Sequence, residues 1–186
     1  MAARALDGIR VLDLTTPLGE ATGRVLADLG AEVIKIEPPG GCESRFAPPF
    51  AEPPNAAAPR PESPGGDPEQ SLFWRSFGLG KRSVVLDLDE QTDHERLLAL
   101  VRTADILIES STPGEMAARG LGCDALSGIN PVLLYLSVSR FGETGPDARQ
   151  PAPVLTLAAG GGVGDNRGEG GGPGVPGGGP EGAQGG

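Results

Sequence analysis

Short apolar stretches alternate with amphipathic ones along residues 8–138. The apolar stretches are rich in Val, Ile and Leu and have the length of buried strands: residues 8–15 (GIRVLDLT), 31–37 (AEVIKIE), 83–88 (SVVLDL), 105–110 (DILIES) and 131–138 (PVLLYLSV). Helical spacing or helix-start signals fall between them, in residues 21–30, 90–104, 113–122 and 123–131. Gly30 is placed to close the first helix in the left-handed conformation. The alternation predicts an α/β fold, with a parallel sheet and helices on both faces.

Two segments interrupt this pattern. Residues 42–70 are rich in Pro and Ala and have no period, which predicts an irregular insertion. Directly after it, Leu72, Phe73, Trp74 and Phe77 are expected to form a compact hydrophobic anchor. Residues 160–186 hold 15 Gly and 3 Pro among 27 residues, a composition that cannot offset the entropy of ordering. We therefore predict one domain over residues 1–159 and a disordered Gly/Pro-rich tail over residues 160–186.

The net charge of the chain argues against some classes of binding partner. A net charge of −10 repels nucleic acid and anionic membranes, and the basic residues do not cluster. Cys42 and Cys123 lie far apart without metal-ligand spacing, which favours a reduced, cytoplasmic chain without a metal site. The apolar runs are too short for a membrane span or a signal peptide.

Five blocks of the sequence occur together in an order that is typical of one family. They are LDGIRVLDLT, LADLGAEVIKIEPPGG, GKRSVVLDL, ADILIESSTPGEMAARGLG and INPVLLYLSVSRFGETGP. Together they resemble the N-terminal part of the family III CoA-transferases, which include formyl-CoA and carnitine–CoA transferases and 2-methylacyl-CoA racemases. The resemblance implies a Rossmann-like domain that binds CoA, in an intertwined homodimer of longer chains. The present chain is therefore expected to be incomplete relative to the family.

The resemblance also implies which residues contact CoA. These residues come from the loop after the first strand, the end of the second, the third strand and the turn after the fourth: Leu18, Gly19, Pro38, Leu86, Asp87, Ser110, Ser111, Thr112 and Arg119. Arg119 lies one place beyond the matching position, which Ala118 occupies. A one-residue shift on a helix turns a side chain by about 100°. Contact between Arg119 and a phosphate therefore departs from the family pattern.

The catalytic groups of the family do not match this sequence. Transferases of the family use an aspartate that attacks the acyl-CoA thioester, and the comparable segment, residues 175–182 (VPGGGPEG), contains no Asp. Asp165 matches a glycine-rich loop upstream of the nucleophile and is expected to be a solvated loop acid. The racemases need a His–Asp pair, whereas the single histidine, His94, is expected at the surface at the start of a helix. We assign no catalytic residue.

The sequence leaves two functions open. The first is transfer of CoA between an acyl-CoA thioester and a carboxylate, without metal or redox cofactor, by a truncated chain that is inactive alone. The second is a non-catalytic CoA- or acyl-CoA-binding protein, or a subunit that pairs with a separate C-terminal half. A dinucleotide site is disfavoured because TPLGEATG lacks G-x-G-x-x-G. A Walker loop at Lys81 is disfavoured because Arg75 and Arg82 replace its Gly and Ser/Thr, so Lys81 and Arg82 are expected in a basic turn. Arg45 is a further basic candidate.

Overall fold

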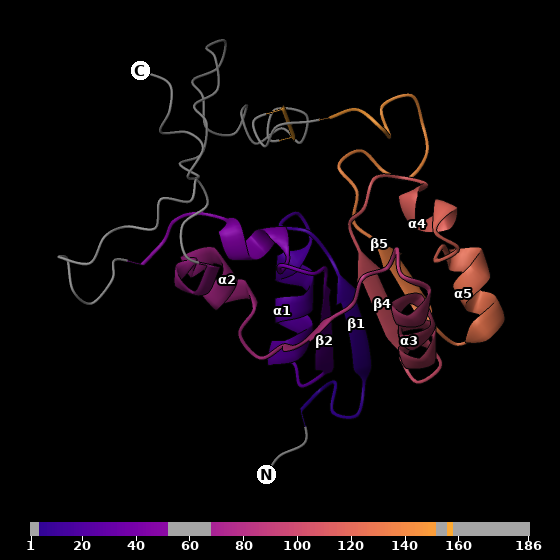
Figure 1. Cartoon of the computed structure of the whole chain (residues 1–186), viewed down its shortest axis with the longest axis horizontal. Helices are drawn as coiled ribbons and strands as arrows, with labels where there is room; N and C mark the ends of the chain where they lie inside the picture. Colours follow the sequence, from indigo (N-terminus) through magenta and orange to yellow (C-terminus); the bar gives the residue numbers. More distant parts are fainter. Residues whose placement is uncertain (1–3, 52–67, 152–155, 158–186) are drawn as a thin grey trace. The chain divides into compact units, whose positions relative to one another are not determined.

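The computed structural model describes residues 4–51, 68–151 and 156–157 (Figure 1). The chain divides into two compact units, residues 1–139 and residues 140–186. The first unit holds the sheet and its helices, whereas residues 140–151 of the second form bends and turns. The predicted tail, residues 160–186, and residues 52–67 of the predicted insertion lie outside the described residues.

Five strands form one parallel sheet. They are β1 (Arg10–Leu14), β2 (Glu32–Glu37), β3 (Arg82–Val85), β4 (Ile106–Glu109) and β5 (Leu134–Ser137). Their order in the sheet is β3-β2-β1-β4-β5, and every neighbouring pair is parallel. The chain builds outward from β1 to β3 and then crosses back to place β4 on the other side of β1. This order confirms the predicted Rossmann-like parallel sheet.

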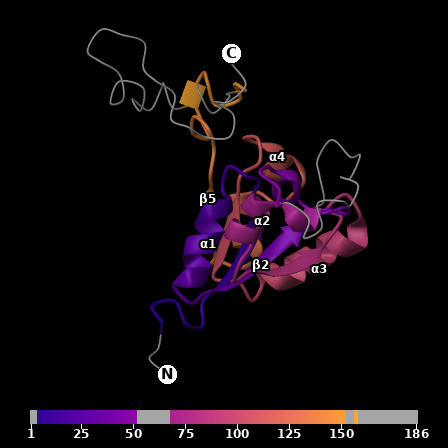
Figure 2. The same ribbon diagram turned by 90° about the vertical axis from the view of Figure 1, so that its left-hand side faces the viewer.

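Helices cover both faces of the sheet, as predicted. They are α1 (Glu20–Asp28), α2 (Leu72–Phe77), α3 (Gln91–Val101), α4 (Glu115–Ala118) and α5 (Cys123–Ile129). Buried residues of α1 pack on one face, and those of α3, α4 and α5 pack on the other. In Figure 2 the molecule is turned so that α1 and α2 face the viewer. Gly30 follows α1 with a φ of +108°, which confirms its predicted left-handed conformation.

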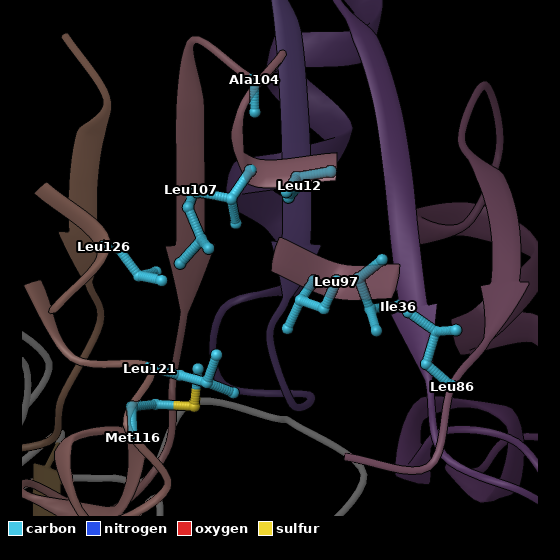
Figure 3. Packing of buried hydrophobic residues seen from close by; sticks show 10 residues of the cluster. Leu12, Ile36, Leu86, Leu97, Ala104, Leu107, Met116, Leu121 and Leu126 are labelled. Atoms are coloured by element: carbon cyan, nitrogen blue, oxygen red, sulfur yellow. The ribbon is translucent and has the colours of Figure 1, made fainter. Parts of the chain in front are cut away.

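Two hydrophobic cores result from the alternation of side chains along the strands. Val11 and Leu12 are neighbours on β1 and point to opposite faces, and both are fully buried. The larger core lies under α3, α4 and α5 (Figure 3) and includes Leu12, Leu97, Leu107, Met116, Leu121 and Leu126. The smaller core, under α1, contains Val11, Ala27, Ala31, Val33 and Ile108. None of the helices within the described residues is long and apolar enough to cross a membrane.

The structure describes the two ends of the predicted insertion, where short 3-10 turns form over η1 (Glu43–Phe46) and η2 (Pro68–Gln70) and Ser44 is buried. One prediction about the residues that follow needs correction. The expected hydrophobic anchor is a short helix with no buried residue, and Leu72 is 41% exposed. The reason is position: α2 packs beside α1 and η1, away from both cores of the sheet. Within α2, the rings of Phe73 and Phe77 lie 4.7 Å apart.

Candidate functional site

A cavity lies at the edge of the sheet where the parallel strands end. The strand order reverses between β1 and β4 at this edge, and ligands of open α/β sheets bind in the crevice at such a reversal. The cavity has a volume of about 280 Å³. Its wall comes from the ends of β1 to β4 and from α4: Leu14, Thr16, Ile36, Glu37, Pro38, Leu86, Asp87, Leu88, Asp89, Ser111, Glu115, Met116 and Arg119. Five separate elements therefore contribute to one concave surface.

The structure brings five of the predicted CoA-contact residues together in this wall. They are Pro38, Leu86, Asp87, Ser111 and Arg119. The other four, Leu18, Gly19, Ser110 and Thr112, lie in the loops after β1 and β4. The predicted residues thus gather at the edge where β1, β2 and β4 end.

The loops after β1 and β4 are joined by hydrogen bonds. The N–H of Thr16 donates to the hydroxyl oxygen of Ser110 at 2.7 Å, and the two hydroxyls lie 2.8 Å apart. Gly19 fits closely behind them, because a Cβ at this position would lie 2.7 Å from Cγ2 of Thr15 and 3.4 Å from Cβ of Ser110. Ser110 therefore fixes Thr16 in the cavity wall, and the absence of a side chain at Gly19 leaves room for Thr15 and Ser110 beside it.

Carboxylates outnumber cations in the wall of the cavity. Glu37, Asp87, Asp89 and Glu115 face a single basic residue, Arg119, whose side chain is 37% exposed. One guanidinium nitrogen of Arg119 lies 3.6 Å from Asp89 and 3.8 Å from Glu115, which are distances of loose ion pairs. These exposed pairs are weak, so Arg119 is free to turn toward an anionic group of a ligand.

Glu37, by contrast, is already neutralised. Its carboxylate accepts two hydrogen bonds from Arg45, at 2.6 and 2.8 Å, and others from the hydroxyl of Ser83 and the N–H of Cys42. Burial by itself would raise the pKa of Glu37, but these donors outweigh it and lower the pKa to about 2. Glu37 therefore presents a fixed, paired carboxylate to the cavity.

Cys42 lies beside this pair. Its side chain is buried, and burial together with the negative charge of Glu37 raises the pKa of the thiol to about 11. A thiol with this pKa stays protonated at neutral pH and is a poor nucleophile. Cys42 therefore behaves as a small buried side chain.

Sequence reasoning missed a buried group of charged residues next to the cavity. Asp13 on β1, Glu20 at the start of α1, Lys35 on β2 and Lys81 before β3 all have side chains that are 0–1% exposed. Lys81 had been expected in a basic turn, and the structure places it in that turn but turned inward. The available signal was local: Lys35 stands between Ile34 and Ile36 in a strand predicted to be buried on both faces.

The residues weighed for catalysis do not line the cavity or lie outside the described residues. His94 lies in the first turn of α3 and is not among the lining residues, although its Nε2 lies 3.1 Å from the carbonyl oxygen of Arg119. Asp165 and residues 175–182 lie outside the described residues. Within the described residues, His, Cys, Asp and Glu side chains form no group of three or more that could hold a metal ion.

Comparison with known proteins finds CoA-transferases among the relatives of this chain. Acetyl-CoA:oxalate CoA-transferase of Acetobacter aceti is 42% identical over 148 residues, which are 78% of this chain and 34% of that protein. Succinyl-CoA:mesaconate CoA-transferase of Haloarcula hispanica is 39% identical over 158 residues, covering 83% of this chain and 37% of the relative. The crystal structure of a CAIB/BAIF family protein from Brucella suis matches with a TM-score of 0.79 and 32% identity, over 95% of this chain and 44% of that one.

The chain therefore spans less than half the length of the relatives that it matches. The family model for CoA-transferase family III covers residues 6–181, almost the whole sequence. The sheet order, the relatives and the family model agree, and the chain belongs to CoA-transferase family III.

Proposed function

We propose that this chain forms the CoA-binding part of a transferase that moves CoA between an acyl-CoA thioester and a free carboxylate. The cavity at the carboxyl edge of the sheet carries the proposal, because five residues that the family resemblance assigns to CoA contacts line it. The relatives support it, since they are named as CoA-transferases that act on different acyl groups.

The lining of the cavity suits one part of a CoA molecule. Its volume of about 280 Å³ lies at the lower end of ligand sites, so it accommodates a portion of CoA while the rest extends along the surface. Leu14, Leu86 and Met116 supply apolar contact, and Asp87 accepts hydrogen bonds from amino or hydroxyl groups. Arg119 supplies the positive charge that a phosphate needs.

The transfer reaction needs a nucleophilic carboxylate, and none is assigned among the described residues. In the family, an aspartate attacks the thioester carbonyl: a C–O bond forms, the C–S bond breaks, and CoA leaves as a thiolate. The acyl group is then held as a mixed anhydride with the aspartate. The thiolate attacks the aspartyl carbonyl of this anhydride, which releases the donor acid as a carboxylate and leaves a CoA thioester on the enzyme. The acceptor carboxylate runs the same two steps in reverse and leaves as the new acyl-CoA. No electron is transferred overall, so the reaction requires no redox cofactor. An aspartate is already ionised at neutral pH, so it needs no metal to become a nucleophile. We propose that residues 1–186 do not supply this aspartate and give no turnover by themselves.

One observation favours assembly with a separate C-terminal half. Among the described residues, β5 pairs on one side only, with β4, and its Leu134 and Leu136 are 55% and 38% exposed. An apolar edge strand of this kind is a docking surface. The chain would then work in the cytoplasm as a CoA-binding subunit, or in a homodimer of assembled halves.

The state of Glu37 argues against a dinucleotide-binding function. In dinucleotide-binding folds the acid at the end of the second strand accepts hydrogen bonds from the ribose hydroxyls. Here the same position is Glu37, but Arg45 and Ser83 already use both carboxylate oxygens. A ribose would have to displace a bidentate Arg–carboxylate pair, which is among the stronger polar contacts in proteins.

Calorimetric titration of the full chain tests the proposal. We expect heat of binding with CoA, weaker binding with dephospho-CoA and none with NAD. In a thioester exchange assay, the chain alone should give no turnover, and addition of the C-terminal part of a family member should restore it. Absence of CoA binding at millimolar concentration would overturn the proposed function. Turnover by the chain alone, lost in Asp165→Ala, would overturn only the separate supply of the aspartate.

A further inference from the structure

Four charged side chains form one buried network under the loop that joins β1 to α1. Lys35 lies 3.2 Å from Asp13 and 2.5 Å from Glu20, and Lys81 lies 2.7 Å from Asp13 and 2.5 Å from Glu20. Each lysine therefore contacts both acids, and each acid contacts both lysines. The hydroxyl of Ser44 completes the set, since it donates to Glu20 at 2.7 Å. We call Asp13, Glu20, Lys35 and Lys81 the buried tetrad.

The buried tetrad holds the first residue of the β1–α1 loop directly. Asp13 accepts hydrogen bonds from the N–H of Thr15 at 2.9 Å and from its hydroxyl at 2.6 Å. Lys35 donates to the carbonyl oxygen and to the hydroxyl oxygen of Thr15. All the hydrogen-bonding groups of Thr15 are thus engaged by two members of the tetrad, and the next residue, Thr16, lies in the cavity wall.

The buried tetrad also holds the far end of the same loop. Glu20 is the first residue of α1, and Lys81 contacts both its carboxylate and its main-chain carbonyl, the latter at 3.1 Å. Because Lys81 also binds Asp13, one ammonium group ties the end of β1 to the start of α1. The loop that contains Leu18 and Gly19 is therefore fastened at both ends by buried charges.

Charge balance makes these contacts interdependent. Two cations and two anions cancel, whereas removal of one member leaves an uncompensated buried charge, which is strongly unfavourable. Well-packed apolar residues of similar volume would stabilise such a site equally well or better. A gain in stability alone therefore does not explain why four charged residues occupy this site. Their hold on the β1–α1 loop does explain it.

We infer that the buried tetrad is a positioning device for the CoA site, in which Lys81 sets the β1–α1 loop without touching the ligand. This inference rests on the proposed function, because it assigns the loop to CoA binding. It predicts that loss of Lys81 weakens CoA binding through displacement of the loop. The interaction passes from Lys81 through Asp13 to Thr15, and from there to Thr16 in the cavity wall.

The variant Lys81→Met tests the inference in the full chain. We expect CoA affinity, measured by calorimetry, to fall roughly tenfold or more, as small displacements in a site commonly do. Hydrogen exchange followed by mass spectrometry should show faster exchange at the amides of residues 15–19. Arg82→Met is the matched control, because Arg82 is the next residue, is 75% exposed, and pairs with Glu32 outside the tetrad. It should change neither quantity.

A double variant separates positioning from stability. Glu20→Gln with Lys81→Met leaves one buried anion and one buried cation, so its melting temperature should recover toward that of the wild type. If Lys81 positions the loop, CoA affinity stays low and residues 15–19 still exchange fast. If affinity and protection recover together with the melting temperature, the tetrad is only structural and the inference is overturned. If the wild-type chain fails to bind CoA, the proposed function is wrong. Hydrogen exchange at residues 15–19 would still show whether the buried tetrad orders the loop.

Discussion

The guanidinium of Arg45 binds both carboxylate oxygens of Glu37, with Nε 2.6 Å from Oε2 and Nη2 2.8 Å from Oε1. Glu37 ends β2 at the wall of the cavity, and Arg45 lies in η1, within the segment that its composition predicts to be irregular. One bidentate pair therefore fastens this segment to the sheet. The pair also removes the charge of Glu37 from the ligand site, so the electrostatics of the cavity depend on a residue outside its wall.

The first prediction concerns the pH dependence of stability. The pKa of Glu37 lies at about 2 in the folded chain, against an ordinary value of 4.5. A depressed folded-state pKa gives stability that is fully present above pH 4.5 and is lost as the pH falls toward 2. This loss should amount to about 3 kcal/mol. In urea denaturation at a series of pH values, Glu37→Gln should therefore be less stable than the wild type at pH 6, with a difference that shrinks below pH 4.5.

Glu43→Gln is the control for this titration, because Glu43 is an exposed carboxylate in the same segment. Its stability should follow that of the wild type across the whole range. A gap between Glu37→Gln and the wild type that stays constant from pH 6 to pH 2.5 would contradict the lowered pKa.

The second prediction uses the single tryptophan of the chain as a reporter. Arg45 stacks over the ring of Trp74, with Cζ 4.3 Å from the ring centroid. Arg45→Met removes this cation and leaves Glu37 buried without its partner, so the free energy of unfolding should fall by about 3 kcal/mol. The emission spectrum of Trp74 in the folded chain should also change. Arg75→Met, an exposed position beside Trp74, should leave both unchanged; an unaltered spectrum in Arg45→Met would refute the stacking.

The third prediction concerns the charge at the cavity. Arg119 is the basic residue of the wall, and Asp89 competes for it at 3.6 Å. Arg119→Gln should weaken CoA binding by roughly tenfold at low salt, whereas Asp89→Asn should strengthen it, because the guanidinium is then free to face a phosphate. Calorimetry at 50 mM and 500 mM salt (about 14 Å and 4 Å of Debye length) should show the effect shrinking. Arg96→Gln, an exposed change on α3, serves as the control.

If Arg119→Gln binds CoA as tightly as the wild type, the phosphate contact assigned to Arg119 is wrong. The one-place shift of this residue relative to the family pattern would then be the physical reason. In that outcome Asp89→Asn should also have no effect, since both changes act through the same guanidinium.

The strands were predictable because a parallel sheet is buried on both faces. In residues 105–110, for example, Ile106, Leu107 and Ile108 form an unbroken apolar run, and the structure places β4 at Ile106–Glu109. Strand ends were less exact: residues 83–88 were expected as a strand, and β3 covers Arg82–Val85. Beyond Val85 the N–H of Leu86 still donates to the carbonyl oxygen of Glu37 at 2.9 Å, and Leu86 and Asp87 then line the cavity.

The charged interior was missed for a different reason. A lysine in a strand is ordinarily taken as solvent-facing, and the burial of Lys35 depends on partners from three other elements. Asp13 is 22 residues away and Lys81 lies 68 residues beyond Asp13, so neither local pattern nor helical spacing connects them. Arg45 and Glu37 stand only 8 residues apart, yet their pairing needed the turn at Pro38–Gly41 to bring them together.

The last prediction compares alanine substitutions at two glycines that lie inside helices. Alanine in place of a glycine inside a helix ordinarily stabilises a protein by about 1 kcal/mol. Gly128 in α5 has nothing within 4 Å of a built Cβ, so Gly128→Ala should stabilise the chain by that amount. Gly23 in α1 lies against the buried tetrad: its Cβ would fall 2.1 Å from a carboxylate oxygen of Asp13 and 3.0 Å from the ammonium of Lys81.

Gly23→Ala should therefore destabilise the chain by about 2 kcal/mol, the usual scale of overpacking, despite the gain in helix propensity. Urea denaturation of both variants and the wild type measures the change in the free energy of unfolding, which should have opposite signs in the two variants. Because Asp13 is held by Thr15 and by both lysines, it cannot move aside without breaking the contacts that hold the loop. If Gly23→Ala stabilises the chain as Gly128→Ala does, the carboxylate of Asp13 moves freely and the tetrad cannot hold the β1–α1 loop in place.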